Sequence, residues 1–405
     1  MPFNTDALGA RPASAQPTTS DALVPRPAPR AEVRALTGLR GIAALMVAVY
    51  HIDPELRSLG AFGRAIGRGY LWVDLFFVLS GFVLALNYGA RFERGWSAGS
   101  WRDFLLRRVA RIYPLYAVLL LGALAYMAMG WGQSFAMPLL PYPHLVHPLA
   151  IKAANVVMVQ SWGVGPSVDG TAWSLSAEWA AYVLFPLLAG LALFSRGRTA
   201  FALAALAAAG IVATATLTGI DHEAHSGALD AYDGRTIEPV LRCLSGFVLG
   251  LLMFRLAQGG RVSAWLARDD VLAALLLLTA LGFAFAPDDL WIYPLFPPLV
   301  LGLYGNCGAI GRMLGGGAVY WLGLVSYSIY LVHPYLVLPK RDLATLLAGA
   351  LGHVPADIAA SVAAFTAVLV LSGASYRLIE EPGRRALNRA ARTWIKRPAT
   401  PLSSV

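Results

Sequence analysis

The chain has 405 residues, of which 57% are hydrophobic and only 14% are charged. Soluble globular domains usually carry about a quarter charged residues, so the composition excludes a large soluble enzyme and favours an all-α polytopic membrane protein. The formal net charge of +9 does not require a nucleic-acid partner, because excess Lys and Arg in a membrane protein reflects topology and contact with anionic lipid headgroups.

The apolar residues fall into ten segments that are long enough for transmembrane helices, each of which needs about 20 mostly apolar residues. They follow residues 1–33, which are rich in Pro, Ala, Ser and Thr and which we interpret as a disordered cytoplasmic tail. A ten-helix membrane domain would occupy residues 34–385, and residues 386–405 would form a basic cytoplasmic tail. The expected helices are 38–56, 70–90, 112–131, 171–193, 199–219, 239–257, 270–287, 289–306, 318–339 and 357–379.

The distribution of basic residues favours an even number of helices with both termini in the cytoplasm. In this topology the cytoplasmic segments hold 24 of the 32 Lys and Arg residues, as the positive-inside rule expects. Segment 146–162 is also apolar, but Lys152, Asn155 and Gln160 interrupt it. We therefore expect residues 146–162 to form a helix in the membrane interface rather than an eleventh span.

The two cysteines, Cys243 and Cys307, lie in apolar segments and are interpreted as buried structural thiols. No cluster of Cys and His has the spacing of metal ligands, so we expect no metal site. The candidate functional groups are instead the ionisable side chains inside the apolar segments, because such side chains are costly in a membrane.

Arg40 and His51 lie in the first expected helix, RALTGLRGIAALMVAVYHI. His51 follows Arg40 by eleven positions, which places them within roughly 20° of the same helix face and about 16 Å apart along the axis. One face would thus carry a cation at the cytoplasmic edge and an imidazole in the outer half of the membrane. The alternative is that His51 only makes a packing hydrogen bond to a neighbouring helix.

Asp74, Glu178 and His333 fall in the outer half of the membrane with His51 in this topology. Two imidazoles and two carboxylates at one depth resemble a proton-transfer site, in which Asp74 or Glu178 would hold an imidazole in one tautomer. In the alternative interpretation the two carboxylates are structural ion-pair partners of Arg242, and His333 caps a helix end.

Arg108 and Arg111 lie at the start of the third helix, in FLLRRVARIYPLY. Their spacing of three residues places them on one helix face at the cytoplasmic membrane edge. Paired guanidinium groups are well shaped to hold phosphate or pyrophosphate. The alternative is an anchor on lipid phosphates that satisfies only the positive-inside rule.

Six segments together resemble the acyltransferase-3 family of integral membrane acyltransferases. This family includes bacterial O-acetylases of lipopolysaccharide O-antigen, peptidoglycan and exopolysaccharide, and acyltransferases of macrolides. Arg40 and His51 match its Arg-x10-His motif, and Arg108 and Arg111 match its Arg-x-x-Arg motif. The resemblance extends from about residue 34 to 385 through LTGLRGIAALMVAVYH, WVDLFFVLSGFVL, FLLRRVARIYPLY, TAWSLSAEWAAYVLFPLL, VSYSIYLVHP and IEEP, and it adds Tyr327 and Trp173 as further candidate site residues.

The resemblance implies an O-acyltransferase of the bacterial cytoplasmic membrane. It would move an acyl group, by default acetyl, from cytoplasmic acyl-CoA to a hydroxyl of a sugar, a cell-surface polysaccharide or a related glycoconjugate. Arg108 and Arg111, with Arg40, would hold the phosphates of acyl-CoA, which is a donor substrate and not a permanently bound cofactor. His51 would act as a general base or accept the acyl group transiently, oriented by one of the two carboxylates.

A secondary transporter or flippase with a buried His/carboxylate proton relay is the second hypothesis. A proton relay has no need of a phosphate clamp, so the arginine pair favours the acyltransferase. The other large class of membrane acyltransferases typically combines a buried His with an Asn. It is disfavoured because Asn87, Asn155 and Asn306 do not lie with a His in a matching motif.

Overall fold

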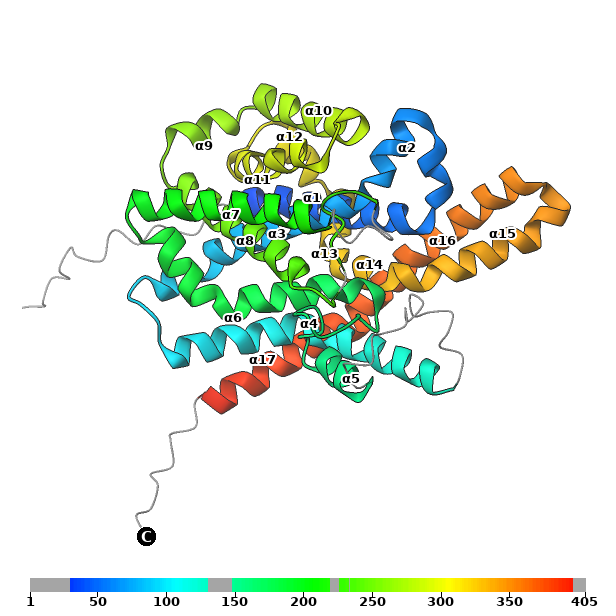
Figure 1. Ribbon diagram of the computed structural model, residues 1–405, viewed down its shortest axis with the longest axis horizontal. Helices are drawn as coiled ribbons and strands as arrows, with labels where there is room; N and C mark the ends of the chain where they lie inside the picture. The colour runs from blue at the N-terminus through cyan, green and yellow to red at the C-terminus, as the bar shows by residue number, and fades with distance from the viewer. Residues whose placement is uncertain (1–29, 130–147, 219–225, 233, 396–405) are drawn as a thin grey trace, which may run out of the picture.

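The computed structural model describes residues 30–129, 148–218, 226–232 and 234–395, and within these ranges every regular element is helical (Figure 1). Most of the two expected tails, residues 1–29 and 396–405, lies outside the described residues. The rest of both tails is helical, because the first helix already begins at Arg30 and the last one continues to Ile395.

The α-helices follow one another with short 3-10 turns between several of them. Their bounds are α1 Arg30–Ile52, α2 Gly60–Gly67, α3 Trp72–Tyr88, α4 Ala98–Ala128, α5 Pro148–Val156, α6 Trp173–Leu193, α7 Gly197–Thr218, α8 Glu238–Ala257, α9 Arg261–Leu266, α10 Asp269–Phe285, α11 Phe296–Gly305, α12 Ala309–Leu314, α13 Gly317–Leu324, α14 Ser326–Val332, α15 Val337–Leu351, α16 His353–Ser375 and α17 Glu381–Ile395. A π-helical turn, Tyr376–Glu380, joins α16 to α17.

Seven helices of the described residues are long and apolar enough to cross a membrane, and a bent pair makes an eighth if it counts as one span. The chain is thus a multi-pass membrane protein, but the expected count of ten is not confirmed. Two of the expected spans form α10, with 17 residues, and α11, with 10 residues. At 1.5 Å per residue these helices measure about 26 and 15 Å, less than the ~30 Å hydrocarbon core. The expected interfacial helix at 146–162 corresponds to α5, although residues 146 and 147 lie outside the described part.

Helices α3 and α8 pack closely in the centre of the bundle because glycines face the partner backbone. A Cβ atom on Gly81 would lie 2.0 Å from the carbonyl oxygen of Phe247, and one on Gly250 would lie 2.1 Å from that of Val78. Small residues allow this approach in membrane helices, where van der Waals packing holds helices together. The core around this crossing is formed by side chains of α1, α3, α4, α6, α8 and α14.

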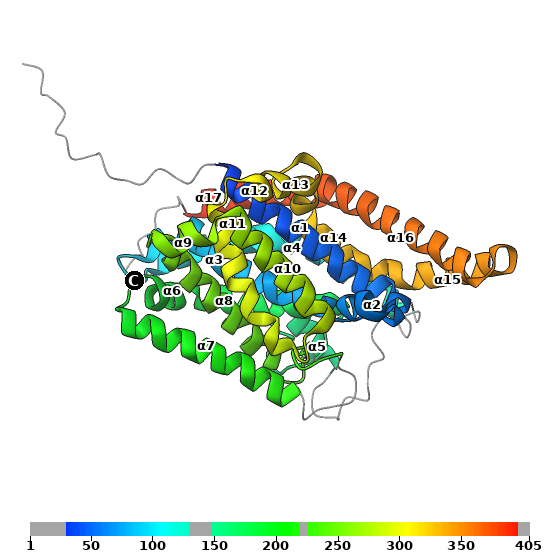
Figure 2. The same cartoon turned by 90° about the horizontal axis from the view of Figure 1, so that it is seen from above.

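The helix expected at 318–339 is broken. Helix α13 ends at Leu324, the chain from Ser326 onward is bent by 56° relative to it, and residues His333–Leu336 form a 3-10 turn. The following helix α15 extends beyond the expected span and forms a hairpin with α16 that projects from the bundle (Figures 1 and 2). The break leaves the carbonyl of Gly323 available to side chains, as described below.

A buried lysine attaches this hairpin to the end of α1. The Lys340 ammonium lies 3.2 Å from Asp53 Oδ1, 3.2 Å from Glu55 Oε2 and 2.6 Å from Asp357 Oδ1. Ser361 of α16 donates a 2.6 Å hydrogen bond to Asp53. The three carboxylates are close enough together to hold a metal ion, but the Lys340 ammonium group already lies among them and pairs with each, and we interpret the cluster as structural.

Candidate active site

Two cavities lie along α1, one at each of its two candidate residues. The arginine cavity has a volume of about 200 Å³ and contains Arg40. The histidine cavity, of about 720 Å³, contains His51. Val73 and Tyr330 line both cavities, so these two side chains form the wall between them. The predicted spacing of about 16 Å along one helix face therefore spans two adjoining cavities.

The break between α13 and α14 holds Arg40 in the arginine cavity. Arg40 donates a 3.0 Å hydrogen bond to Ser326 Oγ and a 2.9 Å bond to the carbonyl of Gly323. An unbroken helix would use this carbonyl for its own i to i−4 bond. The bent helix thus supplies acceptors that fix one edge of the guanidinium group.

Arg108 and Arg111 enter the arginine cavity from α4. Arg108 donates a 3.0 Å bond to the Tyr88 hydroxyl and lies 5.0 Å above the centre of that ring, whereas its Nε has no hydrogen-bond partner in the part of the chain that the structure describes. Arg111 forms an ion pair with Glu380, which is fully buried and also accepts a 3.0 Å bond from Ser328. Both arginines are therefore held by aromatic and acidic neighbours rather than extended toward lipid.

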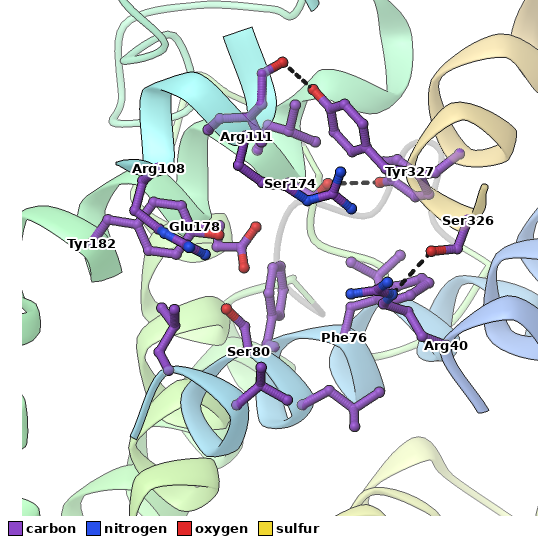
Figure 3. A pocket seen from close by; sticks show the side chains of 18 of the residues that line it. Arg40, Phe76, Ser80, Arg108, Arg111, Ser174, Glu178, Tyr182, Ser326 and Tyr327 are labelled. Atoms are coloured by element: carbon purple, nitrogen blue, oxygen red, sulfur yellow. Dashed lines mark hydrogen bonds between the residues drawn. The ribbon is translucent and has the colours of Figure 1, made fainter. Parts of the chain in front are cut away.

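The guanidinium groups of Arg40, Arg108 and Arg111 converge from three sides on one pocket, and Glu178 lies near Arg108 (Figure 3). Arg111 is within electrostatic range of both other arginines. Glu178 interacts with Arg40 and Arg108, and it accepts side-chain hydrogen bonds from Ser80 and Tyr182. With Glu178 and the Glu380 partner of Arg111, three cations face two carboxylates, which leaves a surplus of positive charge for an anion.

His51 is paired with a second histidine at the edge of the histidine cavity. Its Nδ1 lies 2.9 Å from the carbonyl oxygen of Val47 and 3.2 Å from Nε2 of His333. The Nδ1 of the fully buried His333 lies 3.0 Å from the carbonyl oxygen of Ile329. A carbonyl only accepts, so each Nδ1 carries the proton when the rings are neutral. The Nε2 of His51 then has a lone pair, and it has no hydrogen bond within the described residues.

The expected contact between His51 and a carboxylate is not found among the described residues. Both carboxylate oxygens of Asp74 accept hydrogen bonds from Arg242, at 2.8 and 2.6 Å, and both residues are fully buried. A buried guanidinium needs a paired carboxylate, which explains why Asp74 faces α8. Glu178 lies in the arginine cavity, because it is five residues, or about 7.5 Å, further along α6 than Trp173 in the histidine cavity.

The two additional candidates occupy different cavities. Tyr327 lines the arginine cavity, lies beneath Arg111 at 5.5 Å, and donates a 2.6 Å hydrogen bond to the carbonyl of Ile112. Trp173 lines the histidine cavity and lies 5.3 Å from the guanidinium of Arg242. Tyr327 thus contacts Arg111 and Trp173 contacts Arg242, and a role of either aromatic residue in the reaction stays a prediction.

Two residues that line these cavities, Tyr330 and Asp169, and Glu380, the ion-pair partner of Arg111, were not singled out by sequence reasoning. Glu380 belongs to the IEEP segment, so its signal was present, but nothing in the sequence indicated that it meets Arg111. Tyr330 and Asp169 gave no signal, because a Tyr in an apolar helix and an Asp in a short loop are common. Only the packing of α14 against α1 and α6 places Tyr330 between the cavities.

Comparison with known proteins gives a consistent assignment. The model of the acyltransferase-3 family, described as an acyltransferase domain, matches residues 33–377. Acyltransferase MdmB of Streptomyces mycarofaciens is 30% identical over 389 residues, which cover 87% of this chain and 92% of that protein. Protein 2 in the picA locus of Rhizobium radiobacter is 32% identical over 149 residues, 36% of this chain and 74% of that protein.

O-acetyltransferase OatA of Staphylococcus aureus is 22% identical over 378 residues, which cover 86% of this chain and 57% of that protein. No solved structure matches the chain. The family match includes both cavities and all the arginines and histidines described above. The chain is an acyltransferase and belongs to the acyltransferase-3 family of membrane proteins.

Proposed function

We propose that this acyltransferase transfers an acyl group from acyl-CoA to a hydroxyl of a sugar-containing acceptor. The observation that carries the proposal is the arginine cavity, whose surplus positive charge adjoins an imidazole with an available lone pair. We propose acetyl as the acyl group, because a relative is named an O-acetyltransferase. Acyl-CoA is the donor of choice, because its pyrophosphate and 3′-phosphate are anions that paired arginines bind well.

In this proposal the CoA phosphates bind to Arg40, Arg108 and Arg111. The pantetheine arm then passes between Val73 and Tyr330 and brings the thioester to His51. The arginine cavity faces the cytoplasm, because the positive-inside rule places the basic end of α4 there. The acceptor enters from the opposite side of a bacterial cytoplasmic membrane.

His51 Nε2 removes the proton from the acceptor hydroxyl, whose oxygen forms a bond to the thioester carbonyl carbon. The carbon–sulfur bond breaks, and the proton passes from His51 to the departing CoA sulfur. His333 supports the imidazolium because its Nε2 accepts a hydrogen bond from His51 Nδ1–H. The same lone pair on His51 would serve a route through an acyl-imidazole.

The test uses the purified chain in proteoliposomes without an ion gradient, with radiolabelled acetyl-CoA and cell-envelope carbohydrate as acceptor. We expect label in the carbohydrate fraction, and we expect His51→Ala to reduce transfer about 100-fold or more, as loss of a general base does. Retained transfer in His51→Ala would remove the histidine from the mechanism. Absence of any acylated product, together with solute movement that requires an ion gradient, would support the transporter instead.

A further inference from the structure

Asp169 is a buried carboxylate that the mechanism above does not use. It lines the histidine cavity, its exposed fraction is 2%, and neither carboxylate oxygen has a hydrogen-bond partner among the described residues. The backbone of Asp169 is fixed, because its carbonyl accepts a 2.8 Å bond from Ala172 at the start of α6. The backbone that carries this carboxylate is thus held in place at the cavity, and within the described part of the chain the carboxylate has no hydrogen-bond partner.

Four tyrosines lie within electrostatic range of Asp169, but their hydroxyls are used elsewhere. Each phenol donates to a backbone carbonyl, so none neutralises or solvates the carboxylate. The bonds are Tyr116 to Asn155 at 2.6 Å, Tyr327 to Ile112 at 2.6 Å, Tyr330 to Thr171 at 3.1 Å and Tyr335 to Leu119 at 3.5 Å.

A buried polar group without a partner is costly, and the cost is larger for a charged group. Burial accordingly raises the pKa of Asp169 to about 7. A ligand that brings hydrogen-bond donors to this carboxyl group would recover the cost. The unpaired carboxylate therefore marks a place where a substrate, rather than the protein, completes the hydrogen bonding.

The rest of the histidine cavity indicates what kind of substrate fits. Its volume of about 720 Å³ is within the range of small-molecule sites. Trp173, Tyr50 and Tyr232 contribute aromatic surface, and Arg57 stacks on Tyr50 at 4.2 Å. The buried Asp230 lines the same cavity, so Arg57 and Asp230 bring opposite charges to it, whereas hydroxyl groups and aliphatic ring faces match the aromatic part of the lining.

We propose that Asp169 binds hydroxyl groups of a neutral sugar ring and thereby presents a neighbouring hydroxyl to Nε2 of His51. The proposal rests on the proposed function, since it assigns the acceptor class of the same enzyme. A carboxylate accepts hydrogen bonds from two adjacent hydroxyls, and a protonated carboxyl both donates and accepts. In either form a hydroxyl group is a suitable partner.

The test uses the full-length chain in proteoliposomes with acetyl-CoA as donor. The probe acceptors are phenyl glycosides of neutral hexoses and of glucosamine with a free amine. We expect a neutral glycoside to saturate transfer, and Asp169→Asn to raise its half-saturation concentration about ten-fold, which corresponds to about 1.4 kcal/mol. The half-saturation concentration of acetyl-CoA should stay within about two-fold. Asp342→Asn, which removes an exposed carboxylate of α15 outside both cavities, is the matched control and should behave as wild type.

Thermal unfolding separates substrate binding from a structural role. Because Asp169 is unpaired, Asn at this position removes a desolvation cost, so the Tm without acceptor should be unchanged or higher. A lower Tm with equal losses in donor and acceptor saturation would overturn the proposal, as would an unchanged acceptor half-saturation concentration.

The choice of sugar is tested by the same panel. Saturation by the glucosaminide alone would overturn the neutral-sugar class, and saturation by none of the glycosides would overturn a sugar at this position. Failure of the proposed function is distinguishable, because the wild-type chain would then release no CoA from acetyl-CoA with any acceptor or with water.

Discussion

The Nε2 atom of His333 lies 3.2 Å from Nδ1 of His51, and this contact replaces the carboxylate that the sequence led us to expect. Because Nδ1 of His333 is engaged with the carbonyl of Ile329, its Nε2 is an acceptor. It thereby favours the tautomer of His51 that leaves Nε2 unprotonated toward the cavity. A neutral imidazole thus takes the place that an Asp often has in general-base sites.

We expect His333→Ala to lower kcat about 10- to 100-fold, because His51 Nδ1–H loses its side-chain acceptor, which supports the imidazolium, and keeps only the Val47 carbonyl. The half-saturation concentration of acetyl-CoA should change less than two-fold, since His333 does not line the arginine cavity. Steady-state kinetics at matched membrane levels check this. A variant with wild-type kcat would show that the contact has no catalytic role.

The arginine pair is tested by replacing Arg108 and Arg111 with Lys. Lysine keeps the charge but loses the planar fork, so each lost phosphate contact should cost about 1.5–3 kcal/mol and raise the donor KM about ten-fold or more. Arg102→Lys, on the exposed side of the same helix, is the matched control. An unchanged donor KM in the double variant would leave Arg108 and Arg111 as topology determinants.

The pair of Asp74 with Arg242 predicts a stability defect rather than a catalytic one. Asp74→Ala leaves a buried guanidinium unpaired, which typically costs about 3–5 kcal/mol. Replacing both residues, as in Asp74→Ala with Arg242→Met, should recover most of that loss in thermal unfolding. If Asp74→Ala instead keeps its Tm and loses only kcat, Asp74 acts on the reaction.

The position of Tyr330 between the cavities predicts a variant in which hydrolysis of acetyl-CoA is uncoupled from acyl transfer. The Tyr330 hydroxyl shares a 2.7 Å hydrogen bond with Ser174, which holds the ring in place. Tyr330→Ala should widen the passage between the two cavities and increase hydrolysis of acetyl-CoA by water relative to transfer, whereas Tyr330→Phe should keep the passage narrow. The ratio of released CoA to acylated acceptor is the measurement, and an equal ratio in both variants would contradict this role.

A pH dependence follows from the pKa of Asp169, which burial raises to about 7. The carboxylate accepts more hydrogen bonds once it is ionised. The half-saturation concentration of the acceptor should therefore fall as the pH rises from 6 to 8. The four surrounding phenols ordinarily titrate near 10 and stay neutral in this range, while His51 and Arg57 share the cavity. The comparison is with Asp169→Asn, in which the contribution of residue 169 is absent and any remaining trend belongs to the other titratable groups of the cavity, which include His51 and Asp230.

Sequence patterns predicted the elements whose signal is local. The apolar segments, the face shared by Arg40 and His51, and the pairing of Arg108 with Arg111 all follow from helical periodicity. The break after Leu324 could not be predicted, because VSYSIYLVHP is apolar throughout and differs little from a straight span. The short lengths of α10 and α11 were equally hidden, since hydropathy does not indicate where a helix ends in the membrane.

Contacts between distant segments were the hardest to foresee. The sequence offered Asp74 and Glu178 as partners for His51 by depth alone, and depth does not determine which neighbour a side chain faces. Arg242 was considered as a partner and proved to be the one that binds Asp74. The meeting of Arg111 with Glu380 depends on α17 folding back against α4, which no local pattern encodes.

The Lys340 cluster connects the end of α1, near His51, to residues that lie outside both cavities. Asp53 follows His51 by two residues, and it is held by Lys340 of α15 and Ser361 of α16. The backbone that carries the His51 imidazole is thus tied at its end to the projecting hairpin. Substitutions of Lys340 or Asp357 that break this cluster should slow turnover without changing a residue that lines either cavity, so the cluster acts as a remote determinant of the position of His51.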